Sequence, residues 1–276
     1  MSGPQDIFGI GVAGNFTGHL EQAGEAADFA HVVTRDAKAP KGIFPWYLPG
    51  DGTSFLHTWP LSSDALRLPD DPTYRVQTEP EVGLRCELSY DGDRVTRVHP
   101  VEMAAWNDAS IRQPPAPKIS LKKNWGANTK GCAARTIAID GLAAGGLADR
   151  FRLASFLVTE DSLLDYGEDS ALVGYSYFHQ TLLDWLADRL SFQEDGGPLE
   201  NMSQLLAAHG HPSQCWVSIG ATRYTEQGDR RMLARGEQSV VVVYDAELHS
   251  AASIRDRARS GDDVAEGMSL LRQTVT

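Results

Sequence analysis

The sequence predicts a β-rich α+β protein, and three observations lead to this prediction. Several short segments alternate apolar and polar residues with a period of two, which is typical of strands with one buried face. Few segments carry the 3.6-residue apolar spacing of an amphipathic helix. Strands and helices do not alternate regularly along the chain, as a parallel βα fold would require. We therefore expect the 276 residues to form one β-rich domain.

The N-terminal region predicts short elements. Residues 7–15 are an apolar run that ends in glycine, which favours a buried strand followed by a turn. Their glycine spacing resembles that of a dinucleotide-binding loop, but no long helical pattern follows, so we predict no dinucleotide site. Residues 16–32 allow a short helix. Residues 39–72 are rich in proline, glycine and aspartate and are typical of loops and short strands.

The middle of the chain carries the clearest periodicity. Residues 82–90 alternate strictly and predict a strand, and the turn after them leads into a return strand. Residues 100–110 are expected to form a short helix. Two strand-like pieces fall within residues 136–158, and residues 176–190 carry a convincing amphipathic helix whose aromatic stripe faces the core.

The C-terminal third is predicted as strands between loops. Residues 192–213 are polar and form a predicted insertion. Residues 216–224 and 239–245 predict two closing strands. Residues 249–276 form a charged tail, which we expect to be helical or partly loose.

The charge balance excludes some classes of partner. The chain has 25 basic and 37 acidic residues, a net charge of −12. Non-specific nucleic-acid binding and docking on anionic membranes both need positive charge, so we expect neither partner. No stretch approaches the roughly 20 apolar residues that span a bilayer.

The cysteines and the N-terminus lead us to expect a cytoplasmic protein. Cys86, Cys132 and Cys215 are sparse and lack CxxC spacing, so we expect free, packed thiols in a reducing compartment. The first 16 residues lack the charged start and apolar run of a secretory signal.

Three carboxylates form the most informative pattern. Glu79 and Glu81 open the alternating strand, and residues two apart on a strand project to one face. Adjacent carboxylates repel unless a cation or a proton lies between them, and hard divalent cations such as Mg²⁺ accept such oxygens. Asp108 follows 27 positions after Glu81, with Arg112 and Lys123 nearby. Together they would make a combined metal and anion site.

Other polar features are less specific. Residues 111–135 are locally basic and form either a solvated face or an anion site. His209 and His211 are expected at the surface, because two loop histidines alone do not make a zinc site. No serine lies in the sequence context of a nucleophile elbow, which argues against a serine hydrolase.

In order along the chain, these residues resemble the motifs of the fumarylacetoacetate hydrolase superfamily. The matching segments are residues 11–19, 40–45, Glu79-Pro80-Glu81, 107–112, 122–126, a glycine-containing loop at 166–169 before the helix at 176–190, 219–222 and 233–237. The resemblance implies a mixed β-roll of the superfamily's C-terminal-domain type with flanking helices, assembled as a homodimer. Residues 1–74 would then be the lid and strand region, 75–248 the metal-binding core and 249–276 the tail.

The resemblance also implies roles for individual residues. Glu79, Glu81 and Asp108 would bind Mg²⁺ or Mn²⁺. The implied catalytic residues are His19, Lys123, Arg112 and Glu21, and the implied substrate-binding residues are Asn15, Phe16, Lys122 and Thr222. The substrate would be a 2-oxo acid or a 1,3-dicarbonyl, hydrolysed as in acylpyruvate or fumarylacetoacetate hydrolysis.

Two assignments stay open at this stage. The superfamily's lid often has glutamate three residues after the histidine, where this chain has Gln22, so Glu21 or Glu25 substitutes or the water-activating pair is altered. Lys122 and Lys123 compete for one role, and we prefer Lys123. A decarboxylase or isomerase on the same metal site, and a non-catalytic protein that binds a small acid or a metal, are therefore alternatives to the hydrolase.

Overall fold

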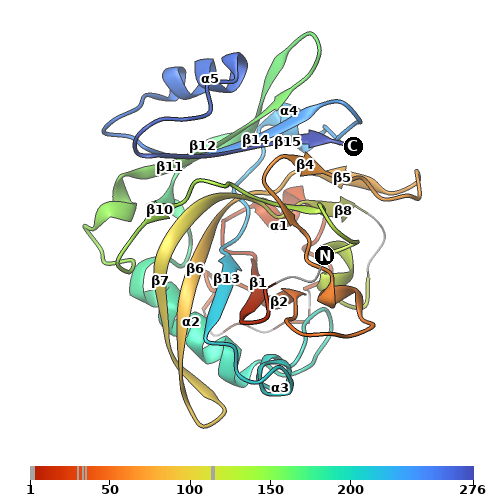
Figure 1. The fold of residues 1–276 in the computed structure, drawn as a ribbon, viewed down its shortest axis with the longest axis vertical. Coiled ribbons are helices and arrows are strands. Elements are labelled where there is room, and N and C mark those ends of the chain that lie inside the picture. The colour runs from red at the N-terminus through yellow and green to blue at the C-terminus, as the bar shows by residue number, and fades with distance from the viewer. Residues whose placement is uncertain (1–3, 30, 33, 35, 113–115) are drawn as a thin grey trace.

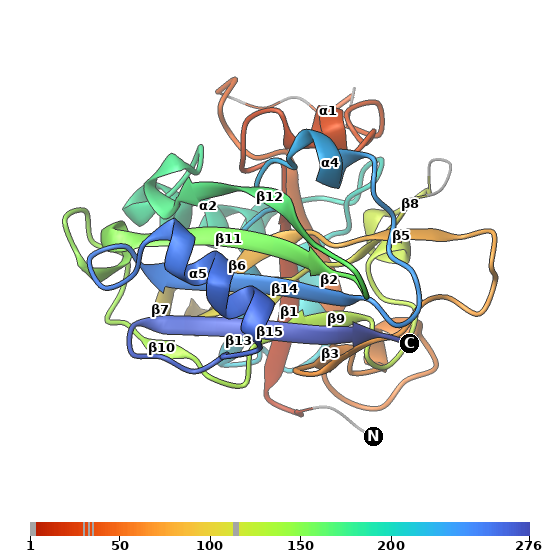
Figure 2. The ribbon, with the colours of Figure 1, turned by 90° about the horizontal axis from the view of Figure 1, so that it is seen from above.

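A computed structural model describes residues 4–29, 31–32, 34, 36–112 and 116–276. A large curled sheet and a smaller sheet pack on each other, with helices on their outer sides (Figure 1). Seen from above, the smaller sheet lies under helix α5, Ala251–Ser260 (Figure 2). The predicted β-rich α+β class with flanking helices is confirmed.

The large sheet is built around one long hairpin. Its strands follow the order β2-β1-β13-β6-β7-β9-β3, and β10 also pairs with β7. Their bounds are β1 Ile7–Ala13, β2 Gly42–Tyr47, β3 Leu61–Ser62, β6 Pro80–Asp91, β7 Arg94–Asn107, β9 Lys130–Cys132, β10 Ile137–Ala138 and β13 Gln214–Ser218. Strand β1 runs parallel to β13, and β6 runs antiparallel to both β13 and β7.

The smaller sheet has the order β12-β11-β14-β15-β4. Its strands are β4 Ala65–Leu66, β11 Phe151–Val158, β12 Leu163–Ala171, β14 Gln238–Asp245 and β15 Met268–Val275, and β5 Arg75–Gln77 pairs separately with β8 Ser110–Arg112. Strand β14 contains four consecutive valines because both of its faces are buried. Val241 and Val243 join the main core, whereas Val240 and Val242 pack with Ile254 of α5.

The principal helix covers the large sheet. Helix α2, His179–Phe192, packs Leu182, Leu186 and Leu190 into the same core as β6 and β7. The remaining helices are short: α1 His19–Gln22, α3 Met202–Ala208 and α4 Glu226–Asp229, with 3₁₀ turns at Phe55–His57, Ile119–Lys122, Leu147–Arg150 and Leu172–Gly174. No helix in the described ranges is both long and apolar enough to cross a membrane.

Three local predictions are wrong. Residues 100–107 belong to β7 and not to a helix, because they pair with β6 and bury side chains on both faces, which removes the alternation. Residues 166–169 lie in β12 and not in a loop. The tail holds α5 and then β15, which is an inner strand because it pairs with both β14 and β4, so residues 239–245 do not close the sheet.

Several other predictions are confirmed. Residues 82–90 lie in β6, and the amphipathic helix corresponds to α2. Cys86, Cys132 and Cys215 are free thiols, and Cys86 lies opposite Cys215 on paired strands.

The insertion at 192–213 is not wholly loop, since it contains α3.

Candidate metal centre

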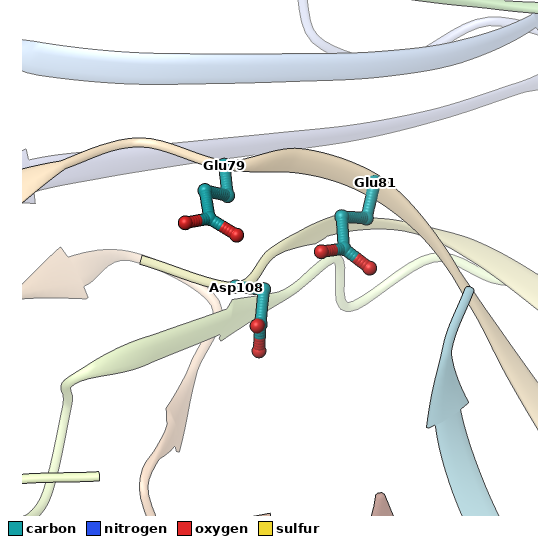
Figure 3. A group of neighbouring side chains, drawn as sticks. All are labelled: Glu79, Glu81 and Asp108. Carbon is teal, nitrogen blue, oxygen red and sulfur yellow. The ribbon is translucent and has the colours of Figure 1, made fainter. Parts of the chain in front are cut away.

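The open end of the β6–β7 hairpin brings the three predicted ligands together. Pro80 at the start of β6 pairs with Asn107 at the end of β7, and the Asp108 backbone N–H donates to the Glu79 carbonyl over 2.9 Å. Glu79 and Glu81 flank Pro80, so their side chains leave the same face. Figure 3 shows the carboxylates of Glu79, Glu81 and Asp108 pointing into one space. One oxygen from each lies within 4.8 Å of the others.

These carboxylates are buried and paired with cations. Lys123 Nζ lies 2.6 Å from Glu79 Oε2 and 2.8 Å from Asp108 Oδ2. Lys130 Nζ contacts the other carboxylate oxygen of Asp108. Arg112 Nη2 lies 2.8 Å from Glu79 Oε1. Glu79, Glu81 and Asp108 are at most 3% exposed, so each charge needs a partner inside the protein.

The pairing decides how these groups titrate. Burial would raise the pKa of Glu79, but the charges of Lys123 and Arg112 outweigh it and hold that pKa well below its ordinary value. Burial would lower the pKa of Lys123, but Asp108 and Glu79 outweigh it and raise that pKa. Lys130 differs, because its burial prevails over Asp108 and lowers its pKa.

Glu81 is the least compensated carboxylate. Its Oε2 accepts a hydrogen bond from the Gly220 backbone N–H over 2.7 Å. Burial, with the nearby charge of Asp108, raises its pKa well above the ordinary value. Gly220 has a φ of 111°, which residues other than glycine rarely adopt, and this conformation directs its N–H at the carboxylate. Tyr175 also donates to the Gly220 carbonyl over 2.8 Å.

His19 lies beside the carboxylates at the start of α1. Its Nε2 is 4.0 Å from Glu79 Oε2, and the side chain is buried. Burial lowers its pKa to about 4, against the opposing charge of Glu79, so the imidazole is neutral at pH 7. Within the described ranges, both ring nitrogens lack a hydrogen-bond partner of good geometry, although the Thr222 backbone lies close by.

The acids considered as partners of His19 lie elsewhere. Glu21 is exposed on the outer side of α1 and does not line the site, so its predicted catalytic role has no structural support. Glu25 is buried, but its carboxylate pairs with Arg112 Nη1 over 2.9 Å. The Gln22 carboxamide bonds to the backbone N–H and carbonyl of Tyr224. Among the described residues, none of these three side chains forms a hydrogen bond or an ion pair with His19.

The predicted substrate-binding residues divide into two groups. Thr222 lies beside His19, and its buried hydroxyl has no hydrogen-bond partner among the described residues. Lys122 bonds to Asp28 over 2.7 Å, so of the two lysines that competed for one role, Lys123 is the one that reaches the carboxylates. The Asn15 amide is occupied by the backbone of Tyr177 and Ile219, and Phe16 packs edge-on against Tyr175. Asn15, Phe16 and Lys122 therefore position neighbouring segments.

Sequence reasoning missed Lys130. It lies on β9, is fully buried and contacts Asp108. The basic stretch at 111–135 was expected as a solvated face or an anion site, yet Lys122, Lys123 and Lys130 are all buried. One signal was available: Lys130 is followed by Gly131, Cys132 and two alanines, which are unusual neighbours for a solvated lysine.

The centre has little free space beside the carboxylates. His19, Phe44, Glu79, Glu81 and Lys123 line a cavity with about 10 Å³ of space for the centre of a water molecule. That is about the minimum for a single water. Entry of a substrate therefore requires movement of the surrounding segments.

The donor set fits a divalent cation. Three carboxylates offer hard oxygen donors, which Mg²⁺ and Mn²⁺ prefer to nitrogen or sulfur. Burial of all three carboxylates would hold the ligands in place, and the Gly220 N–H orients Glu81 as an outer partner. The residues therefore suit such an ion, with Glu79, Glu81 and Asp108 as its ligands.

Comparison with protein families places the chain. Residues 25–275 match the model of a family of unknown function, DUF5718. The chain belongs to this family. No curated protein matches this DUF5718 chain. The match covers the three carboxylates and the cations that pair with them, and it begins after His19.

Solved structures share the fold of this DUF5718 chain at low identity. A candidate HpcE protein from Mycobacterium smegmatis is 15% identical with a TM-score of 0.54, over 98% of this chain and 74% of that one. A candidate fumarylacetoacetate isomerase/hydrolase from Oleispira antarctica is 11% identical with a TM-score of 0.52, over 99% and 96%. A maleylpyruvate hydrolase from Sphingobium sp. SYK-6 is 13% identical with a TM-score of 0.50, over 99% and 72%. The fold implied by the sequence resemblance is thus confirmed, and at this identity the likeness concerns fold alone.

Proposed function

We propose that this chain is a divalent-metal-dependent enzyme that acts on a C–C bond or an enol next to a carbonyl. The substrate class is a 2-oxo acid or a 1,3-dicarbonyl. The observation that carries the proposal is the buried group of Glu79, Glu81 and Asp108 with cations and a neutral histidine around it. Proteins that share the fold include a maleylpyruvate hydrolase, which is consistent with such chemistry.

The chain's own residues divide the work. A divalent cation held by the three carboxylates would supply Lewis acidity toward a substrate carbonyl. Lys123 and Arg112 would stabilise negative charge that develops on substrate oxygens. His19 is neutral at pH 7 because its pKa is lowered to about 4, so one ring nitrogen can accept a proton. The burial of these side chains and the small cavity beside them would limit the access of bulk water to developing charge.

A second candidate is an enolate reaction without an attacking water, such as decarboxylation or tautomerisation. Among the described residues, the acids that follow His19 on its own segment do not contact it, because Glu21 is exposed and Glu25 pairs with Arg112. The glutamate beside His19 is Glu79, which is a candidate metal ligand, so this arrangement favours a reaction in which no separate glutamate activates water. Both candidates use the same carboxylates and cations, and they differ only in whether water attacks.

Calorimetric titration of the metal-stripped protein with Mn²⁺ tests the metal centre. We expect stoichiometric binding by the wild type and none by the E79Q/E81Q variant, which keeps the shape of both side chains. Absence of binding by the wild type, measured with and without oxalate, would overturn the proposal.

A screen of acylpyruvates, oxaloacetate and related 2-oxo acids then separates the two candidates. Product analysis by NMR distinguishes hydrolytic cleavage, release of carbon dioxide and exchange of the α-proton. A metal-loaded protein that turns over none of these acids would leave only a binding protein.

A further inference from the structure

Lys123 occupies a special place in the carboxylate group. Its ammonium bridges Glu79 Oε2 at 2.6 Å and Asp108 Oδ2 at 2.8 Å, and it also approaches the Asp108 backbone carbonyl at 3.4 Å. The side chain is 3% exposed. A single protein cation therefore holds two of the three carboxylates that would bind a metal.

The other lysines do not share this position. Lys130 contacts Asp108 through its other oxygen, Oδ1. Lys122 bonds to Asp28, and Lys118 bonds to Asp195 and to backbone carbonyls outside the centre. Lys123 alone among these four bridges two candidate ligands.

A divalent metal ion and the Lys123 ammonium cannot occupy the space between Glu79 and Asp108 at the same time. A divalent ion takes carboxylate oxygens at about 2.0–2.2 Å, so it would lie among the oxygens that Lys123 now contacts. The cavity has about 10 Å³ of space, which leaves no room for an added ion and its waters. A metal ion among these oxygens would lie close to the Lys123 ammonium, and two neighbouring positive charges repel strongly where water is excluded.

We propose that Lys123 is a tethered cation that occupies the carboxylate group until a divalent ion displaces it. This inference rests on the proposed metal-dependent function. In its present position the ammonium already lies 5.5 Å from the centre of the Phe44 ring, whose face can hold a cation. Lys123 also sits just after the 3₁₀ turn Ile119–Lys122, outside any sheet ladder.

The charges in the centre predict what accompanies the metal. Four buried carboxylates, those of Glu25, Glu79, Glu81 and Asp108, face the three cations of Arg112, Lys123 and Lys130. With all of these groups charged, the sum is one formal negative charge, and a divalent ion would leave it positive. An anionic ligand would restore the balance and give the displaced ammonium a counter-charge. Metal and anion should therefore bind cooperatively, with Lys123 as the link.

The test measures Mn²⁺ binding to metal-stripped full-length protein by calorimetry and by electron paramagnetic resonance. It compares the wild type, Lys123→Met and Lys118→Met, each with and without oxalate as the anion. Lys118→Met removes the same charge from the same segment but outside the centre. Without oxalate, we expect Lys123→Met to bind Mn²⁺ at least tenfold more tightly than the wild type and Lys118→Met to match it. Oxalate should tighten Mn²⁺ binding more in the wild type than in Lys123→Met.

Each outcome decides the inference. Equal or weaker Mn²⁺ binding by Lys123→Met, with normal binding by the wild type, would overturn the displacement while leaving the metal centre intact. No binding by either protein, with or without oxalate, would overturn both proposals. If Lys123→Met does not fold, Lys123→Gln answers the question, because it removes the charge but keeps hydrogen-bond donors. Mn²⁺ should then raise the melting temperature of Lys123→Gln more than that of the wild type.

Discussion

The β6–β7 hairpin carries the candidate centre at its open end and a half-exposed ribbon at its turn. Near the turn, Leu88, Val95 and Val98 are buried in the core with α2, while Glu87 and Ser89 face solvent. Toward the open end, residues 80–84 and 103–107 are buried on both faces. Gly83 is needed there, because a Cβ would meet the Trp106 ring at 2.5 Å.

The two ends are therefore held by different interactions. Burial of apolar surface stabilises the turn end, and the stability lost when a buried side chain is truncated increases with the volume removed. At the open end, each buried charge depends on partners from distant segments, namely Lys123, Lys130, Arg112 and Gly220. Replacing one partner should therefore alter both chemistry and stability at the open end, and stability alone near the turn.

The largest effect is expected for Asp108→Asn. This change leaves Lys130 buried without its counter-charge and removes a candidate metal ligand. We expect the free energy of unfolding to fall by about 3–5 kcal/mol, because an unpaired buried charge is costly. Mn²⁺ affinity should fall by roughly 100-fold or more. Urea unfolding and calorimetry measure the two effects.

The double variant Asp108→Asn/Lys130→Met is the control for this prediction. It removes both members of the buried pair, so it should recover part of the lost stability without recovering Mn²⁺ binding. A double variant that is less stable than Asp108→Asn would contradict the charge explanation.

Leu186→Ala examines the turn end. Leu186 is fully buried between α2 and the hairpin, and its truncation should cost about 2–5 kcal/mol of unfolding free energy. Mn²⁺ affinity of the folded protein should match the wild type, measured at a temperature well below the melting transition. A parallel loss of affinity would mean that the two ends do not act independently.

The difference between the two ends also explains what the sequence could predict. Near the turn, one face is buried, so the alternation in residues 82–90 identifies β6, and the 3.6-residue spacing identifies α2. Residues 103–106 of β7 are all buried, so no alternation remains and a helix was predicted instead. The burial of a strand on both faces depends on the tertiary structure.

The candidate centre was predictable to the extent that its residues share local geometry. Glu79 and Glu81 share a face because they are two residues apart on an extended chain. The position of Lys130 depends on β9 pairing with β7, which no local pattern reveals. Which of Glu21 and Glu25 is buried near the centre likewise depends on Arg112, which pairs with Glu25 and comes from a segment far along the chain.

Gly220→Ala should have a smaller effect at the open end. An added Cβ would meet the Asn15 Cβ at 3.0 Å, and the φ of 111° is unfavourable for alanine. We expect a loss of about 1–3 kcal/mol in stability, and about tenfold weaker Mn²⁺ binding because the N–H to Glu81 shifts. Gly210→Ala is the control, since its φ is 73° and nothing lies within 4 Å of its Cβ. Equal Mn²⁺ affinities in both variants would show that the Gly220 N–H does not orient Glu81.

The smallest effect concerns Glu200, which contacts the 3₁₀ turn just before Lys123. Ser120 donates to Glu200 Oε1 over 2.5 Å, and burial raises the pKa of Glu200 to about 7, which Ser120 opposes only in part. Between the unfolded pKa near 4.5 and the folded pKa near 7, the folded chain binds more protons at Glu200 than the unfolded chain does. This contribution therefore makes stability fall as pH rises through that window, and it is constant on either side.

Glu200→Gln removes this dependence and keeps a partner for Ser120. The melting temperature of the variant minus that of the wild type should thus rise between pH 5 and pH 8, by about 2–4 °C for each kcal/mol involved. The exposed Glu194 of the same insertion supplies the control, because Glu194→Gln removes a carboxylate from the surface and leaves the Ser120–Glu200 contact in place. Mn²⁺ affinity should not change in Glu200→Gln if the insertion only supports the Lys123 segment. A change in Mn²⁺ affinity would instead show that residues 192–213 also influence the candidate centre at the open end. The open end would then depend on more distant segments than the turn end does, in addition to being held by different interactions.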